Sequence, residues 1–146
     1  MLLGSSPAEQ RNITAEPGQD VILPCRVPKF NISEEVLEWF RTDPFTHLVF
    51  GHQTADPFAP LNQDPSLKDR VDLQVGQMED GDLSLILRNV TTADSGTYKC
   101  RVYDGDLWCF RAIAGKRPIS IINLKVSPAG ECVFVCGSEV KQLPGC

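Results

Sequence analysis

The feature that most constrains the fold of this chain is a recurring two-residue alternation of apolar side chains. Alternation with this period is typical of β-strands that bury one face, and no helical periodicity of useful length accompanies it. It occurs in at least seven short segments separated by polar, turn-rich connections, namely residues 20–25, 36–41, 47–50, 70–75, 82–88, 97–103 and 119–126. The chain is therefore predicted to be all-β, with two sheets packed as a sandwich.

Two of these segments are predicted to be neighbours. Residues 82–88 place Leu83, Leu85 and Leu87 on one face. Residues 70–75 do the same with Val71, Leu73 and Val75. The connection contains M-E-D-G-D, whose Asp-Gly pair favours a hairpin turn. We expect the two segments to pair antiparallel, with Leu85 in the core.

Three stretches break the strand pattern. Residues 51–69 carry three prolines, which remove ladder donors and so predict a long loop or irregular edge segment. The last segment, residues 128–146, begins within S-P-A-G, contains three cysteines and is predicted to be an irregular tail. Residues 1–9 are interpreted as a leader remnant or linker. This leaves one domain over residues 10–127.

Length and charge exclude several classes of protein. With 146 residues the chain suits one sandwich domain plus an attachment, since two would need about 200 residues. Its formal net charge of −5 and the lack of a polybasic tract argue against nucleic acid or an anionic membrane surface as the main partner. No apolar stretch approaches the roughly 20 residues of a membrane-spanning helix.

Cysteines and glycosylation signals favour an extracellular protein. Six cysteines are present, an even number that suits a disulfide framework. Three of the five asparagines, Asn12, Asn31 and Asn89, open an N-x-[ST] triplet, where chance would give roughly half a triplet. The N-terminus has no secretory h-region. We therefore expect a domain from the extracellular side of the plasma membrane, or a secreted one, whose signal and anchor are not in this sequence.

One ordered set of residues carries a family resemblance. Cys25 lies fourteen residues before Trp39, which stands in E-W-F-R, and Cys100 closes D-G-D-L-S-L-I-L-R-N-V-T-T-A-D-S-G-T-Y-K-C. Over about residues 10–127 this pattern resembles a variable-set (V-set) domain of the immunoglobulin superfamily. Within that set it looks most like butyrophilin-like proteins, myelin oligodendrocyte glycoprotein and the T-cell costimulatory ligands.

The resemblance implies a Greek-key sandwich with a defined core. Cys25 and Cys100 would form the disulfide between the sheets, with Trp39 packed against it. A bridge that closes so long a loop contributes roughly 4 to 5 kcal/mol by chain entropy. Tyr98 would supply the tyrosine-corner hydrogen bond, and Arg70 and Asp94 would form an ion pair at the same end. The long interval before Arg70 leaves room for the extra C′ and C″ strands.

Nothing in the sequence marks an enzyme or a cofactor site. His47 and His52, the two histidines, are interpreted as surface residues at an edge strand, with no marked nucleophile beside them. The cysteines of the tail lack paired C-x-x-C knuckles and histidines, so no metal is predicted. Beyond the core pair, four cysteines allow three pairings. These four are Cys109, Cys132, Cys136 and Cys146. Three alternatives remain open: a bridge from Cys109 to the tail, disulfides with another chain, and free thiols.

The predicted binding surface is the outer face of the sheet that contains Trp39 and Cys100. If these residues point inward, alternation turns their neighbours outward, namely Glu38, Phe40, Lys99, Arg101 and Tyr103. Such a mixture of aromatic and basic side chains resembles interface hot spots. The next loop adds Asp104, Leu107 and Trp108. An alternative is that Trp108 and Phe110 fold back onto the domain or the tail.

The resemblance implies a non-catalytic recognition domain that binds a protein counter-receptor, with T cells as a source of that receptor, and that regulates T-cell activation. No small-molecule substrate is expected. One alternative is homophilic cell–cell adhesion through a homodimer. Another, an antigen-receptor-like variable domain, is disfavoured because R-A-I-A-G-K-R-P-I-S-I-I stands where such a chain carries F-G-x-G.

Overall fold

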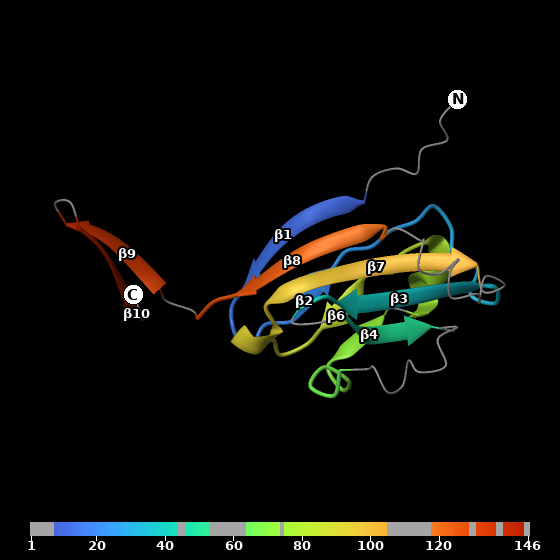
Figure 1. Cartoon of the computed structure of the whole chain (residues 1–146), viewed down its shortest axis with the longest axis horizontal. Coiled ribbons are helices and arrows are strands. Elements are labelled where there is room, and N and C mark those ends of the chain that lie inside the picture. The colour runs from blue at the N-terminus through green and yellow to red at the C-terminus, as the bar shows by residue number, and fades with distance from the viewer. Residues whose placement is uncertain are drawn as a thin grey trace, which may run out of the picture.

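The described part of the chain is built of β-strands and two short 3-10 helices (Figure 1). The computed structural model describes residues 8–43, 46–52, 64–73, 75–104, 118–128, 131–136 and 139–144. Two sheets form the sandwich, so the predicted all-β class is confirmed. The wider sheet has the strand order β1-β8-β7-β3-β4 and the narrower one β2-β6-β5.

The five-stranded sheet is antiparallel except at one edge, where β1 runs parallel to β8. Its opposite edge is β4, so both predicted edge histidines lie on an edge strand. The residues between 53 and 63, where a C″ strand was expected, lie outside the described part of the chain. The strands of this sheet are β1 (Glu9–Ala15), β3 (Glu35–Arg41), β4 (His47–His52), β7 (Gly96–Asp104) and β8 (Ser120–Val126).

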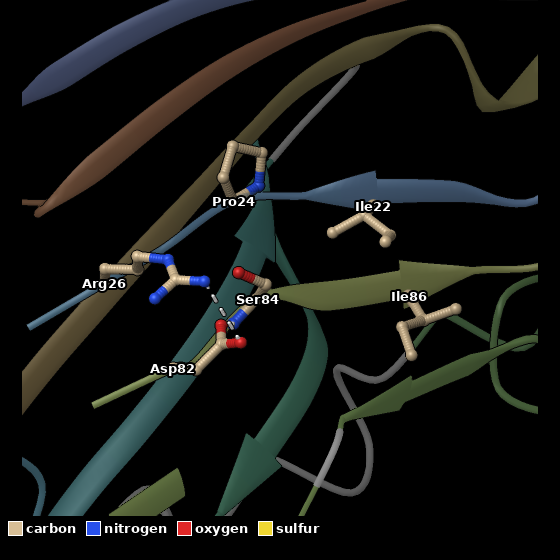
Figure 2. Close-up of a pocket in the computed structure, with 6 residues that line it drawn as sticks. All are labelled: Ile22, Pro24, Arg26, Asp82, Ser84 and Ile86. Atoms are coloured by element: carbon tan, nitrogen blue, oxygen red, sulfur yellow. Dashed lines mark hydrogen bonds and ion pairs between the residues drawn. The ribbon is translucent and has the colours of Figure 1, made fainter. Parts of the chain in front are cut away.

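The three-stranded sheet consists of β2 (Val21–Leu23), β5 (Val71–Leu73) and β6 (Leu85–Leu87). An isolated bridge between Arg26 and Asp82 continues the β2–β6 pairing beyond the strand ends. The inner side chains of this sheet are buried, whereas Ile22 and Ile86 project from the outer face (Figure 2).

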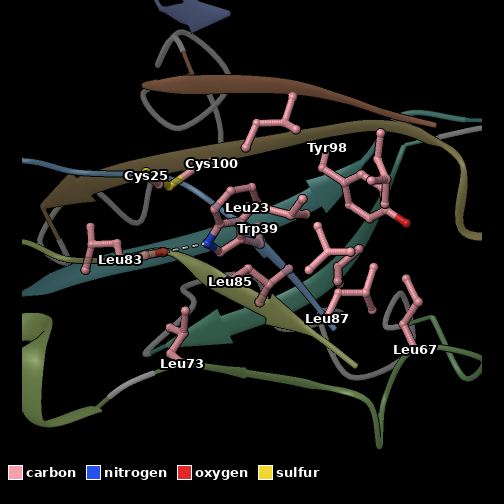
Figure 3. Close-up of a cluster of buried hydrophobic side chains, with 14 of the residues drawn as sticks. Leu23, Cys25, Trp39, Leu67, Leu73, Leu83, Leu85, Leu87, Tyr98 and Cys100 are labelled. Atoms are coloured by element: carbon pink, nitrogen blue, oxygen red, sulfur yellow. Dashed lines mark hydrogen bonds between the residues drawn. A yellow bond between two sulfur atoms is a disulfide. The ribbon is translucent and has the colours of Figure 1, made fainter. Parts of the chain in front are cut away.

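The core joins the two sheets at the predicted cysteine pair (Figure 3). Cys25 and Cys100 form a disulfide, which confirms the pairing implied by the resemblance. Trp39 is fully buried, and its indole N–H donates to the Leu83 carbonyl at 2.9 Å. Leu85 and Tyr98 are buried in the same cluster, as expected. This bond pairs the one polar group of the indole, so the ring is buried without an unsatisfied donor.

The antiparallel pairing of β5 with β6 is as predicted, but the hairpin turn is not. Val75 does not continue the strand: it begins the 3-10 helix η1 (Val75–Asp80). Gly81 then adopts φ 92°, and its carbonyl accepts a hydrogen bond from the Val27 N–H at 2.9 Å. The Asp-Gly pair thus serves to bring this connection against residue 27 instead of closing a two-residue turn.

One end of the sandwich is closed by the expected ion pair. Arg70 donates two hydrogen bonds to the Asp94 carboxylate, at 2.8 and 2.9 Å, and Asp94 is buried. The Asp94 carbonyl accepts the Tyr98 hydroxyl at 2.6 Å, which is the tyrosine-corner bond. The hydrogen bond with Asp94 raises the pKa of the Arg70 guanidinium, and burial raises the pKa of the Tyr98 phenol far above its usual range.

The C-terminal segment differs from the prediction of an irregular tail. It contains β9 (Glu131–Cys136) and β10 (Glu139–Pro144), which pair antiparallel as a hairpin. Figure 1 shows this hairpin beyond the end of β8, apart from the sandwich. C-V-F-V-C by itself is too short to predict a hairpin, because its strand conformation depends on a partner strand that supplies backbone hydrogen bonds.

We predict that Gly81→Ala lowers the free energy of unfolding by about 2 to 5 kcal/mol. An added Cβ would lie 1.8 Å from the Val27 carbonyl oxygen, in a backbone conformation that disfavours other residues. Gly18→Ala, with a similar φ of 91° but open space, should cost about 1 kcal/mol. Gly76→Ala, in open space, should change stability by less than about 0.5 kcal/mol. Denaturant unfolding measures all three, and equal losses at Gly81 and Gly18 would contradict the steric explanation.

We also predict that Asp94→Ala lowers the free energy of unfolding by about 3 kcal/mol, because it leaves the Arg70 guanidinium largely buried without its carboxylate. The Arg70 side chain is 23% exposed. The variant also removes the acceptor of the Thr91 backbone N–H. The control is Arg11→Ala, which breaks an exposed pair with Glu9 and should cost less than about 0.5 kcal/mol. Similar losses in the two variants would show that the Arg70–Asp94 pair has no special structural role.

Candidate protein-binding face

The candidate site lies on the outer face of the five-stranded sheet, over β3 and β7. Their register sets Glu38 opposite Arg101, and Phe40 opposite Lys99. The neighbouring residues Trp39 and Cys100 are fully buried in the core. Side chains alternate along a strand, so the predicted outward set does share the outer face.

Arg101 is the centre of this face. Its guanidinium lies 2.8 Å from the Glu38 carboxylate, 5.0 Å from the centroid of the Phe40 ring and 5.8 Å from that of the Tyr103 ring. The Arg101 Nε is buried and has no hydrogen-bond partner. Two rings and a carboxylate therefore hold one cation in a fixed position, an arrangement in which cation–π attraction adds to the ion pair. We call these four residues the Arg101 cluster.

Two members of this outward-facing set are nevertheless buried. Glu38 is 5% exposed and Tyr103 is 2% exposed. Strand alternation tells which face a side chain leaves from, but long neighbours on the same face can cover it. Glu38 and Tyr103 both lie against Arg101, so they support the cluster and present little surface themselves.

The surface that the cluster does present comes from half-buried side chains. Phe40, Lys99 and Arg101 are partly exposed, and Asp104 at the end of β7 is exposed. Leu107 and Trp108, the other predicted contact residues, lie outside the described part of the chain, as does Phe110. The described outer face therefore offers an aromatic and cationic centre.

The edge histidines are less exposed than predicted. The His47 side chain is 9% exposed and lies 3.0 Å from the Asp64 carboxylate. His52 lies 3.3 Å from the Ile32 carbonyl oxygen and packs edge-on against Phe30. Burial favours the neutral form of Asp64, but hydrogen bonds from Ser66 and His47 outweigh it and lower the pKa of that carboxyl. The reason for the error is that Asp64, from the long connection, pairs with His47 on β4.

The three glycosylation triplets are all at the surface. Asn12, Asn31 and Asn89 are each exposed. Asn89, two residues after the end of β6, has a positive φ of 50°, and its backbone N–H donates to the Asp20 carboxylate at 3.0 Å. The Asn31 side chain accepts the backbone N–H groups of Ser33 and Glu34.

The described residues contain no group of three or more candidate metal ligands. Cys132 and Cys136 both lie on β9, while Cys109 and Cys146 lie outside the described ranges. The three alternatives for these cysteines therefore remain open. In the part of the chain that the structure describes, no helix is long and apolar enough to cross a membrane.

A second surface went unnoticed in the sequence. Ile22, on the outer face of the three-stranded sheet, is 58% exposed. The signal was present, since Val21 and Leu23 alternate around it and both are buried. The alternation that assigns Val21 and Leu23 to the core also places Ile22 on the outer face of the sheet.

Comparison with known proteins agrees with the geometry. The family description "Immunoglobulin V-set domain" matches residues 8–112. Mouse butyrophilin-like protein 2 is 29% identical over 133 residues, which are 87% of this chain and 29% of the relative. Human junctional adhesion molecule B is 32% identical over 98 residues, 67% of this chain and 28% of the relative. The chain thus spans less than a third of the length of these relatives.

Solved structures show the same fold. The IgV-like domain of human B7-H4 superimposes with a TM-score of 0.55 at 27% identity, covering 84% of this chain and 94% of that domain. The complex that contains ICOS and ICOS-L provides a chain with a TM-score of 0.62 at 21% identity, covering 88% of this chain and 60% of that one. Both the matched family and the disulfide-linked sandwich lead to one conclusion: this chain belongs to the immunoglobulin V-set domain family.

Proposed function

We infer that this domain is a non-catalytic recognition module on the extracellular side of a cell-surface protein, and that it binds a protein counter-receptor through the Arg101 cluster. The single observation that carries this proposal is the guanidinium held between Phe40, Tyr103 and Glu38. Interface hot spots are enriched in arginine and in aromatic residues that are already ordered. A partner that contacts this face therefore loses little entropy in fixing these side chains.

Regulation of T-cell activation is the biological role that we propose. It is supported by the similarity to mouse butyrophilin-like protein 2 and to the IgV-like domain of B7-H4. Contacts between such surface domains are typically small, and multivalency between two membranes strengthens them. The counter-receptor is then a protein on T cells whose contact surface suits a cation flanked by rings.

A specific observation favours homophilic adhesion as a second candidate, namely the similarity to human junctional adhesion molecule B. In that case the Arg101 cluster of one molecule would contact another copy of the same chain. Beads coated with the chain should then cluster with one another, and Phe40→Ala should abolish the clustering. Binding to T cells without any clustering that depends on Phe40 would favour the counter-receptor proposal.

We predict that Arg101→Ala and Phe40→Ala each weaken binding of the bead-coupled chain to T cells by about tenfold or more. Both remove part of the ordered centre of the face. Flow cytometry with a dilution series of the coated beads measures the effect. The matched control is Lys125→Ala, which removes an exposed charge from β8 of the same sheet and should leave binding within about twofold. Each variant must retain the Cys25–Cys100 disulfide.

Two outcomes would contradict this proposal. One is that the unaltered chain fails to bind either resting or activated T cells and also shows no clustering that Phe40→Ala abolishes. The other is an equal loss of binding in Lys125→Ala and Arg101→Ala, since a general charge effect would then explain the result without a specific site.

We predict that the chain carries glycans at Asn12, Asn31 and Asn89 when mammalian cells secrete it, because all three triplets are exposed. Peptide mapping after enzymatic removal, which converts a glycosylated asparagine to aspartate, identifies each site. Asn62 and Asn123 lack the triplet and serve as internal controls. Three unmodified triplets in secreted material would count against an extracellular protein.

A further inference from the structure

The outer face of the three-stranded sheet has an apolar centre. Ile22 on β2 and Ile86 on β6 are register partners, and Ile22 is 58% exposed. Together with Pro24 and Ser84 they line a shallow depression of about 190 Å³ (Figure 2). Among the residues that the structure describes, Ile22 is the large apolar side chain left exposed. Removing this surface from water would be favourable.

Charges of both signs flank this centre at both ends. At one end Arg26 lies 3.6 Å from Asp82, and the Arg26 side chain is 77% exposed. At the other end Asp20 and Arg88 are both exposed; Asp20 accepts the Asn89 backbone N–H at 3.0 Å, and Arg88 lies 3.5 Å from Asp72 on β5. Along the β2 segment the order is therefore acid at residue 20 and base at residue 26. Along the β6 segment it is acid at residue 82 and base at residue 88.

The spacing of these charges is self-complementary. Residue 23 lies midway between positions 20 and 26, and residue 85 lies midway between 82 and 88. Leu23 and Leu85 are register partners, so the two midpoints lie at the same level of the sheet. Suppose that two copies meet through this face. A two-fold axis that lies in the plane between them and crosses the strands at this level places each strand over the same strand of the other copy, running in the opposite direction. It brings Arg26 opposite the partner's Asp20, and Asp82 opposite the partner's Arg88.

We propose that a second copy of this chain docks on this face to form a two-fold symmetric homodimer. Ile22 and Ile86 lie one residue from the axis, so the apolar side chains of both copies meet at its centre. An isologous contact needs a patch that matches itself, and this patch does so in both hydrophobicity and charge. Two sheets that pack face to face in this way follow the aligned geometry of natural sandwiches.

The size of the patch sets the strength of the dimer. Six residue intervals of a strand span about 20 Å, so the buried area is smaller than the roughly 800 Å² per partner of a stable interface. The dimer should therefore be reversible and weak in solution, and favoured where chains are concentrated at a surface. Because it uses the sheet opposite the Arg101 cluster, both of those clusters stay accessible. The proposal does not depend on what the cluster binds.

Sedimentation equilibrium of the glycosylated, secreted chain, from micromolar to submillimolar concentration, tests the proposal. We expect a reversible monomer–dimer equilibrium. Ile22→Arg should weaken it by about tenfold or more, because it places like charges beside the axis. Phe40→Ala, on the opposite sheet, should leave it within about twofold. Retention of the core disulfide and an unchanged unfolding midpoint show that Ile22→Arg is folded.

A charge exchange tests the orientation of the two copies. Asp82→Arg alone should weaken the dimer, since it sets arginine against the partner's Arg88. The double variant Asp82→Arg with Arg88→Asp should recover part of the loss, because the exchanged pair across the axis is again complementary while the like charges beside Arg26 and Asp72 remain. A monomer at every concentration, a dimer that survives Ile22→Arg, or one that Phe40→Ala abolishes would overturn the proposal. Failure of the double variant to recover association would overturn the two-fold arrangement.

Discussion

The joining of the two sheets through the Cys25–Cys100 disulfide and the Trp39 indole is the constraint on which the rest of the structure depends. The disulfide closes a loop of 75 residues, which removes much of the entropy of the unfolded chain. The indole N–H of Trp39, on the wider sheet, donates to the Leu83 carbonyl just before β6 of the narrower sheet. The same leucine donates its backbone N–H to the Cys25 carbonyl. These core contacts therefore fix the distance and the register between the two sheets without any contribution from surface residues.

A sandwich fixed in this way has two outer faces, and their chemistry differs. Over β3 and β7 a single guanidinium is held by two rings and a buried carboxylate, which produces a rigid cationic and aromatic centre. Over β2 and β6 two isoleucines lie between paired charges of opposite sign. The first arrangement suits a partner of different chemistry, while the second matches itself. Both can be occupied together because the core separates them.

The sequence predicted those features that depend on local pattern or on a well-known combination of residues. Alternation located the strands, and the resemblance supplied the disulfide, the buried tryptophan and the Arg70–Asp94 pair. The prediction from sequence was wrong where contact with a distant segment determines the local structure. Val75 has the right side chain for a strand, but Gly81 must reach Val27, and the chain turns through a 3-10 helix to do so. The tail hairpin likewise depends on the antiparallel pairing of β9 with β10.

The amino-acid sequence by itself determined the fold family, the core and the face from which each strand residue projects, because these follow from side-chain period and from a few residues at set intervals. Only the tertiary structure decided how much of each side chain stays exposed. Exposure depends on which neighbours from other strands lie across a residue: Arg101 covers Glu38, Asp64 reaches His47, and nothing within the described part of the chain covers Ile22 to the same degree. Such contacts join residues far apart in the sequence, where no local pattern records them.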